Sequence, residues 1–398
     1  MKAYSLQRAS RKGLSLLLAG VLAFSLMGTA PATALAAEEA PADTPAATPD
    51  ETVPSVQPVK PVEPVKPAKP LAFKSATVTK TIGAKKFTNK LVKDKKVKGK
   101  LTYTSSNKKV ATVNAKGKVT VTGIGSTTIK VKSKATKGVK AASAKYTLTV
   151  NPKATSIRKA LGAVGGFSVN WKAGNKKQVS GYQVRYAEAK DMKGAKTVSA
   201  GKSTTFKLIT GLKDGATYYV QVRTYAKAKG KKYYSAWSKT KAVTTGVNSG
   251  DEELDAIVKT VLTKKVGTKG TPEQRLKKAF KHVANVKTYP YIRTNDTPKG
   301  NWSVSYAKDL YQTPGGNCYR YAALFCWLAR GLGYDATAVT GSVPSRSRGQ
   351  APHGWVEVKL DGKTYIYDPE MQHVLKGFDL FKMTYKSAPM KYKKAKKQ

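Results

Sequence analysis

Residues 353–370, HGWVEVKLDGKTYIYDPE, predict a β-hairpin that brings a histidine and an aspartate together. Asp361-Gly362 is a strong two-residue turn signal, and alternating apolar and polar residues flank it on both sides. With a two-residue loop, His353 and Asp368 point to the same face of the hairpin. They become diagonal neighbours about 7–8 Å apart at Cα, which is within side-chain reach. A shift of one residue in register would place the two side chains on opposite faces.

Both cysteines of the chain lie upstream, in PGGNCYRYAALFCWLARGLGYDA, residues 314–336. The Pro-Gly-Gly-Asn turn predicts a helix that starts at Cys318 and stops near Gly331 and Gly333. Cys326 follows eight positions later on the same helix. At about 1.5 Å rise per residue the two Cα atoms lie roughly 12 Å apart, beyond the ~7 Å limit for a disulfide. We therefore expect no disulfide between Cys318 and Cys326.

The two thiols have different environments along this helix. Cys318 is expected at the positive end of the helix dipole, where free backbone N–H groups favour a thiolate and can donate to an oxyanion. Cys326 lies among Leu324, Phe325 and Trp327 in the apolar middle of the helix. We interpret Cys326 as an inert core residue.

A nucleophilic thiol needs a base, usually histidine, and the base needs a group that orients it. The chain has three histidines. His282 lies within a predicted amphipathic helix and is interpreted as a surface or packing residue. His373 follows the hairpin without an evident partner. His353 is the candidate base because the hairpin supplies Asp368 beside it.

The cysteine helix and the hairpin resemble the transglutaminase-like superfamily over roughly residues 270–370. GNCYRYAALFCWLARGLGYDATAVTG is similar to the nucleophile helix and the strand after it, and HGWVEVKLDGKTYIYDP to the His-x-Trp-x-Glu strand and the closing Asp-Pro. The resemblance implies a papain-like fold with Cys318 as nucleophile, His353 as general base and then acid, and Asp368 as the group that holds the imidazole tautomer. Asn317 and Gly354 are minor departures from the pattern.

The region before the cysteine domain alternates polar and apolar residues with turn signals, which indicates β-sandwiches. LTYTSSNKKVATVNAKGKVTVTGIGSTTIKV, residues 101–131, resembles bacterial Ig-like domains of group 2. The segments FSVNWKA, GYQVRYAEA and ITGLKDGATYYVQVRTYA resemble successive strands of a fibronectin type III domain, with Trp171 and Tyr182 as expected core aromatics. We expect no chemistry from either sandwich.

After Gly246 the sequence pattern changes from strand-like alternation to helical spacing of apolar residues. DEELDAIVKTVLTKKV has apolar residues at helical spacing and acids in its first turn, and Thr271 with Pro272 predicts the start of a second helix. The predicted fold class is two all-β Ig-like sandwiches followed by an α+β papain-like domain. The predicted segments are a signal peptide 1–36, a Pro-rich linker 37–70, the Ig-like domain 71–152, the fibronectin type III domain 153–247, the transglutaminase-like domain 251–390 and a solvated or charge-docked basic tail 391–398.

The first residues have the layout of a secretory signal. Basic residues precede an apolar run from Leu14 to Gly28, and Ala34-Leu35-Ala36 provides a small-x-small cleavage site. The run is shorter than the ~20 residues that a membrane span needs. We therefore expect removal of the leader, no transmembrane span in the mature chain, and a secreted, cell-wall-associated protein.

The charge of the chain is strongly positive and unevenly distributed. The formal net charge is +50; residues 251–398 hold 26 basic and 13 acidic residues, and residues 1–250 hold 47 basic and 10 acidic residues. Nucleic acid is not expected as a partner, because only 11 of the basic residues are Arg, no binding motif is present and the chain carries an export signal. The charge suits an anionic cell-wall polymer, or lysines that solvate the sheets and protect their edges.

The predicted function is acyl transfer on peptide or protein amides through a thioester, with water or a primary amine as acceptor. The abundant lysines could themselves serve as acceptors. The alternative is a non-catalytic, cell-wall-binding or adhesive protein whose triad domain is vestigial. No zinc-ligand cluster and no calcium loop occur in the sequence, so neither a metal nor another cofactor is expected.

Overall fold

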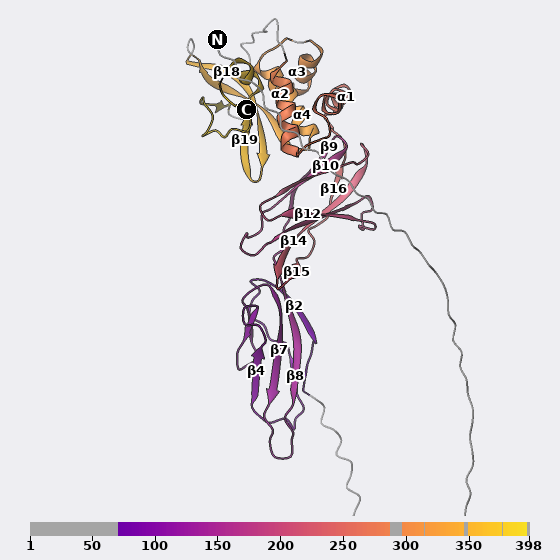
Figure 1. The fold of residues 1–398 in the computed structure, drawn as a ribbon, viewed down its shortest axis with the longest axis vertical. Helices are drawn as coiled ribbons and strands as arrows, with labels where there is room; N and C mark the ends of the chain where they lie inside the picture. The colour runs from indigo at the N-terminus through magenta and orange to yellow at the C-terminus, as the bar shows by residue number, and fades with distance from the viewer. Residues whose placement is uncertain (1–70, 287–296, 314, 346–348, 376, 396–398) are drawn as a thin grey trace, which may run out of the picture. The chain divides into compact units, whose positions relative to one another are not determined.

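The computed structural model describes residues 71–286, 297–313, 315–345, 349–375 and 377–395. The predicted signal peptide and Pro-rich linker lie outside these residues. The described chain forms two β-modules and then an α+β domain (Figure 1). Within the described ranges, no helix is both long enough and apolar enough to cross a membrane.

The first module is a β-sandwich whose main sheet has the strand order β2-β8-β7-β4. Strands β2 and β8 run parallel and the other neighbours run antiparallel. Alternate residues of β7 and β8 point inward, and Ile129 and Leu148 are almost completely buried between the layers. The strands are β1 (Ala72–Phe73), β2 (Thr77–Thr81), β3 (Leu91–Val92), β4 (Leu101–Ser105), β5 (Ala111–Val113), β6 (Val119–Val121), β7 (Gly125–Ser133) and β8 (Ser143–Asn151).

The second module has one sheet in the order β13-β10-β9 and a second in the order β12-β11-β14-β15, with β16 also paired to β14. The expected core aromatics Trp171 and Tyr182 are 1% and 0% exposed, which confirms their placement. The strands are β9 (Ile157–Ala163), β10 (Gly166–Trp171), β11 (Gly181–Ala187), β12 (Lys196–Gly201), β13 (Phe206–Thr210), β14 (Thr217–Ala228), β15 (Lys231–Tyr234) and β16 (Lys241–Thr244).

Three of the five α-helices described in the C-terminal domain begin at the residues that the sequence predicts. The Asp251 side chain caps the first helix, Thr271 forms a capping box with Gln274 at the start of the second, and Cys318 begins the fourth. The third helix and the short fifth helix were not predicted. The helices are α1 (Glu252–Val261), which continues into the π-helical turn η1 (Leu262–Val266), α2 (Pro272–Ala284), α3 (Trp302–Gln312), α4 (Cys318–Gly331) and α5 (Pro369–Val374).

The sheet of this domain is antiparallel and has the order β19-β18-β17-β20. Helix α4 packs against β17 and β18, and its middle is fully buried, with Leu324 and Phe325 at most 1% exposed (Figure 1). The hydrophobic core therefore surrounds α4, with the sheet and helices α1, α2 and α3 packed against it. The strands are β17 (Asp335–Ser345), β18 (Gly349–Leu360), β19 (Lys363–Tyr367) and β20 (Lys393–Lys394).

The segment from residue 391 was expected to be solvated or charge-docked, and the described residues up to 395 are docked on the domain rather than solvated. Lys393 and Lys394 pair with β17, and Tyr392 is only 6% exposed. The Tyr392 ring packs against Trp355 at 5.1 Å, and the Lys394 ammonium contacts the Glu357 carboxylate at 2.9 Å. These contacts anchor the segment although its lysine-rich composition predicts solvation.

Candidate active site

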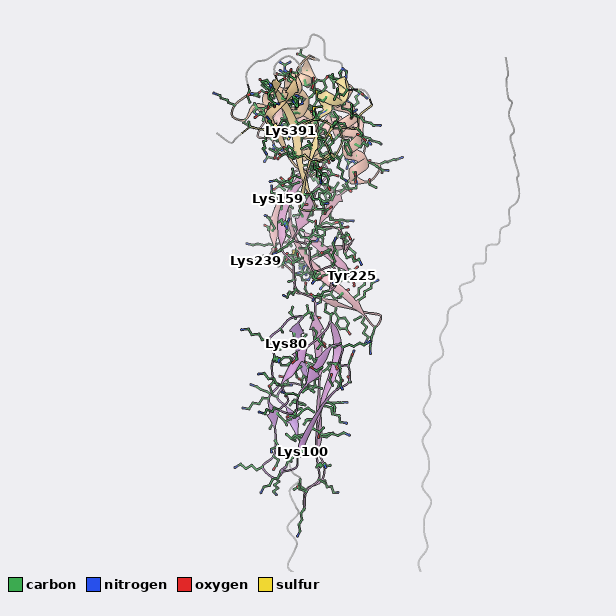
Figure 2. The ribbon with its side chains drawn as sticks, turned by 90° about the vertical axis from the view of Figure 1, so that its left-hand side faces the viewer. Lys80, Lys100, Lys159, Tyr225, Lys239 and Lys391 are labelled. Atoms are coloured by element: carbon green, nitrogen blue, oxygen red, sulfur yellow. The ribbon has the colours of Figure 1, made fainter. Side chains whose placement is uncertain are left out.

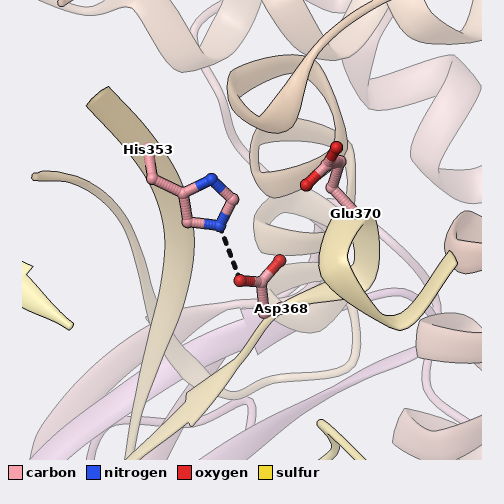
Figure 3. Close-up of side chains that lie close together, drawn as sticks. All are labelled: His353, Asp368 and Glu370. Carbon is pink, nitrogen blue, oxygen red and sulfur yellow. Dashed lines mark hydrogen bonds and ion pairs between the residues drawn. The ribbon is translucent and has the colours of Figure 1, made fainter. Parts of the chain in front are cut away.

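The hairpin of β18 and β19 has the predicted register, with Leu360 paired to Lys363. Asp361 and Gly362 both have positive φ, 51° and 77°, as a two-residue turn of the favoured type requires. His353 Nε2 lies 2.6 Å from Asp368 Oδ2, and both side chains are buried (Figure 3). The predicted proximity of the two side chains is confirmed.

Cys318 lies at the first position of α4, and its side chain is close enough to the His353 imidazole to raise the pKa of His353. Because Nε2 of the imidazole is bonded to Asp368, the nitrogen that faces the thiol is Nδ1. Asn317 caps the helix, and its side-chain oxygen accepts hydrogen bonds from the backbone N–H groups of Tyr319 and Arg320. The cap fixes the start of α4, so Cys318 stays at the positive end of the helix dipole.

The surroundings of His353 favour the protonated imidazole. Burial by itself lowers the pKa of His353, but the Asp368 carboxylate, through its charge and its hydrogen bond, and the Cys318 side chain raise this pKa well above its usual value. An imidazolium between a sulfur and a carboxylate can stabilise a thiolate and later deliver a proton.

Asp368 has a set of hydrogen bonds that holds its carboxylate in place. Oδ1 accepts from the backbone N–H of Met371 at 3.0 Å, because Asp368 is also the N-cap of α5. Oδ2 accepts from His353 and from the hydroxyl of Tyr392 at 2.7 Å. Sequence reasoning missed Tyr392, which lies 24 positions after Asp368 in a segment interpreted as a tail.

Gly354 allows β18 to lie close to the first turn of α4. A Cβ at this position would lie 2.7 Å from Cδ1 and 3.2 Å from Cα of Tyr319. Any larger residue would therefore push apart the elements that carry His353 and Cys318. The departure at Gly354 noted in the sequence thus has a steric reason.

The remaining thiol and histidines lie outside this cluster. Cys326 is fully buried, and burial raises the pKa of its thiol, as an inert core residue requires. His282 is half-buried on α2, where burial and then the charge of Lys265 lower its pKa. His373 donates through Nδ1 to the carbonyl of Ala284 at 3.0 Å.

Glu370 is a second residue that sequence reasoning missed. The residue is 8% exposed, and one ligand atom from each of Glu370, His353 and Asp368 lies within 4.8 Å of the others. Figure 3 shows the Glu370 carboxylate turned toward the imidazole from α5. Burial and the Asp368 charge raise the pKa of Glu370 to about 7, although His353 opposes this rise. The only sequence signal was a glutamate directly after Asp368-Pro369.

Comparisons with known proteins match each of the three modules. The family described as intimin, immunoglobulin-like domain matches residues 93–136, the fibronectin type III domain matches residues 151–241, and the transglutaminase-like superfamily matches residues 259–369. The comparison with curated proteins gave no match.

Two solved structures are similar to parts of the chain. A structure titled "Myokine structure" has 16% identity and a TM-score of 0.21, and the alignment covers 24% of this chain and 98% of that one. The chicken CNTN1 FN1-FN3 domains have 21% identity and a TM-score of 0.22, with coverage of 37% of this chain and 57% of that one.

Immunoglobulin-like domains of the intimin type and fibronectin type III domains are typical of extracellular proteins. The family matches follow the order of the folded modules and agree with the predicted fold class. The chain therefore carries an intimin-type Ig-like domain, a fibronectin type III domain and, at its C-terminal end, a domain of the transglutaminase-like superfamily.

Proposed function

We propose that the C-terminal domain is a cysteine enzyme that forms a thioester on Cys318 with peptide or protein amides. The observation that carries the proposal is one connected chain of contacts. The Cys318 side chain lies close enough to His353 to raise the pKa of the imidazole, and Nε2 of the imidazole lies 2.6 Å from the buried Asp368. A nucleophile, a base and a group that orients the base are the parts that thiol catalysis needs.

In the proposed reaction, the Cys318 thiolate attacks the amide carbonyl carbon and the carbonyl oxygen becomes an oxyanion. Backbone N–H groups at the start of α4 are the expected donors to this oxyanion. The imidazolium of His353 then gives its Nδ1 proton to the leaving nitrogen. The C–N bond breaks, ammonia or an amine leaves, and a thioester with a neutral His353 remains. Asp368 holds the imidazole by its Nε2–H throughout.

We further propose that the protein acts outside the cell, at the envelope. The signal-like N-terminus and the type of the two β-modules support export. The first module supports an anionic polymer as partner, because residues 71–152 contain 20 lysines and a single acidic residue, Asp94. Figure 2 shows side chains such as Lys80 and Lys100 projecting from this module. Lys130 and Lys145 lie directly opposite each other on β7 and β8, where like charges repel unless an anion intervenes.

A peptide assay tests the enzymatic proposal. The full chain is incubated with a glutamine-containing peptide and a fluorescent primary amine, and the products are identified by mass spectrometry. Incorporated amine indicates transamidation, conversion of Gln to Glu indicates deamidation, and a shortened peptide indicates peptidase activity. None of these products, together with equal and slow iodoacetamide labelling of Cys318 and Cys326, would instead support a vestigial domain in an adhesive protein.

A binding assay tests the polymer proposal. The full chain should bind an immobilised phosphate-bearing wall polymer, and binding should weaken as salt screens the lysines. Equal binding to a neutral polysaccharide, or binding insensitive to salt, would exclude charge as the basis of the interaction.

A further inference from the structure

Glu370 lies in the buried centre beside the groups already assigned. Its exposed fraction of 8% is close to the 5% of Cys318 and the 4% of His353. Ligand atoms of Glu370, His353 and Asp368 lie within 4.8 Å of one another (Figure 3). Cys318, His353 and Glu370 are therefore about equally shielded from solvent.

Among the described residues, the charge of His353 is the one interaction that stabilises the Glu370 carboxylate. No hydrogen bond or ion pair of that part of the chain reaches it, and its interactions with His353 and Asp368 are through space. A buried carboxylate without hydrogen bonds is costly even beside a counter-charge. The pKa of about 7, which burial and Asp368 cause, expresses this cost. An acid without a hydrogen bond in this position favours a ligand that brings a positive charge and N–H donors.

The proposed thioester stage creates the need for such a ligand. Before acylation, the positive imidazolium of His353 faces the negative Cys318 sulfur and the Asp368 carboxylate. After acylation, the sulfur and the imidazole are both neutral, so the carboxylates of Asp368 and Glu370 have no cation between them. No lysine or arginine of the described chain forms an ion pair with either carboxylate. A cation that enters at this stage would restore the balance of charge.

We propose that Glu370 binds the ammonium group of a primary-amine acyl acceptor and so directs the thioester toward amine transfer rather than hydrolysis. This inference rests on the proposed function, and it names the acceptor class and the residue that selects it. A compact ammonium group offers three N–H donors, and an ionised carboxylate is the acceptor that it binds most strongly.

The transfer step is balanced with Glu370 as the first proton acceptor. The ammonium gives one proton to the Glu370 carboxylate and becomes a neutral amine. Its nitrogen attacks the thioester carbonyl carbon, the C–N bond forms, and a second proton passes to Nδ1 of His353. The C–S bond breaks and Cys318 leaves as a thiolate beside the imidazolium. The Glu370 proton is then released to solvent.

A metal ion is a poorer occupant of the same cluster, although His353, Asp368 and Glu370 offer three ligand atoms. Nε2 of His353 is within hydrogen-bond distance of Asp368, so its lone pair is not available if it carries the proton. Both Asp368 oxygens already accept hydrogen bonds, from Met371 on one side and Tyr392 on the other. A metal would have to break these contacts, whereas an ammonium group at Glu370 leaves them intact.

The test compares a cationic and a neutral nucleophile in the full chain. Wild type, Glu370→Gln and the exposed control Glu273→Gln are acylated with an activated ester, and the thioester is then offered a fluorescent cadaverine or hydroxylamine. Cadaverine is protonated near neutral pH and hydroxylamine is neutral. The ratio of the two transfer rates is independent of the rate of acylation. One lost charge-assisted hydrogen bond should lower this ratio about tenfold or more in Glu370→Gln. Glu273→Gln should keep the wild-type ratio.

An unchanged ratio in Glu370→Gln would overturn the inference, and so would an equal loss of both transfers. Glu370→Asp, which keeps the charge, should recover most of the ratio. If the variants do not fold, the two transfer rates of the wild-type protein alone test the inference. Its preference for cadaverine over hydroxylamine should exceed that of a free thioester in solution, and equality would overturn the inference. Failure of wild type to form any thioester would refute the proposed function instead.

Discussion

Replacing Glu370 by glutamine should stabilise the C-terminal domain at high pH and have little effect at low pH. In the folded protein, burial and the nearby Asp368 raise the pKa of Glu370 from its usual 4.5 to about 7. Between these values the folded state keeps a proton that the unfolded chain releases, so the stability of wild type falls as pH rises. At about 1.4 kcal/mol per pKa unit, the rise in the Glu370 pKa lowers the unfolding free energy of wild type by about 3 kcal/mol. This loss is complete above about pH 7. Glutamine carries no charge and avoids this loss.

The assay must report this domain alone, because unfolding of a multidomain chain is not a two-state process. Hydrogen-exchange mass spectrometry of peptides from α4 meets this need, since the middle of α4 is completely buried. The difference in opening free energy between Glu370→Gln and wild type should grow by about 3 kcal/mol between about pH 4.5 and about pH 8. The exposed control Glu273→Gln should show a change within about 0.5 kcal/mol. A difference that is the same at both pH values would refute burial of a carboxyl without hydrogen bonds at Glu370.

Three further substitutions test the geometry of the centre. Tyr392→Phe removes the hydroxyl that donates to Asp368, and steady-state kinetics should show kcat reduced about tenfold with KM unchanged; an unchanged kcat would contradict a positioning role. Gly354→Ala places a Cβ 2.7 Å from the Tyr319 ring, so the rate of acylation should fall about 100-fold while the circular dichroism spectrum stays that of wild type. Full activity would contradict the need for β18 to lie close to α4. Cys326→Ala leaves a small cavity and should lower the unfolding free energy by about 1–2 kcal/mol, while the protein is still acylated. Loss of acylation in this variant would make Cys326 the reactive thiol.

The parts of the site that the sequence predicts are those that local chemistry determines. A two-residue Asp-Gly turn sets the register of its strands, and the register determines which side chains share a face, so His353 and Asp368 could be placed together. A helix start is likewise encoded within a few residues, and Asn317 caps α4 at the predicted position.

The parts that were missed depend on contacts between segments distant in the chain. Tyr392 reaches Asp368 because a two-residue strand pairs with β17 and its ring packs on Trp355, and nothing in a lysine-rich segment predicts that pairing. Helix α3 has no side-chain N-cap bond and contains serine and aromatic residues of modest helix propensity. Glu370 is a glutamate in a six-residue helix, and it is buried in a helix that packs against α2 and α4.

The most direct test of the central claim is to find where an acyl group resides on the protein. The full chain is treated with an activated ester, denatured, digested and mapped by mass spectrometry. We predict a hydroxylamine-sensitive thioester on the peptide that contains Cys318, absent from His353→Ala and strongly reduced in Asp368→Asn. Acylation of Cys326 at the same rate, or an adduct on Cys318 that forms equally fast without His353, would contradict a thiol activated by the His353–Asp368 pair.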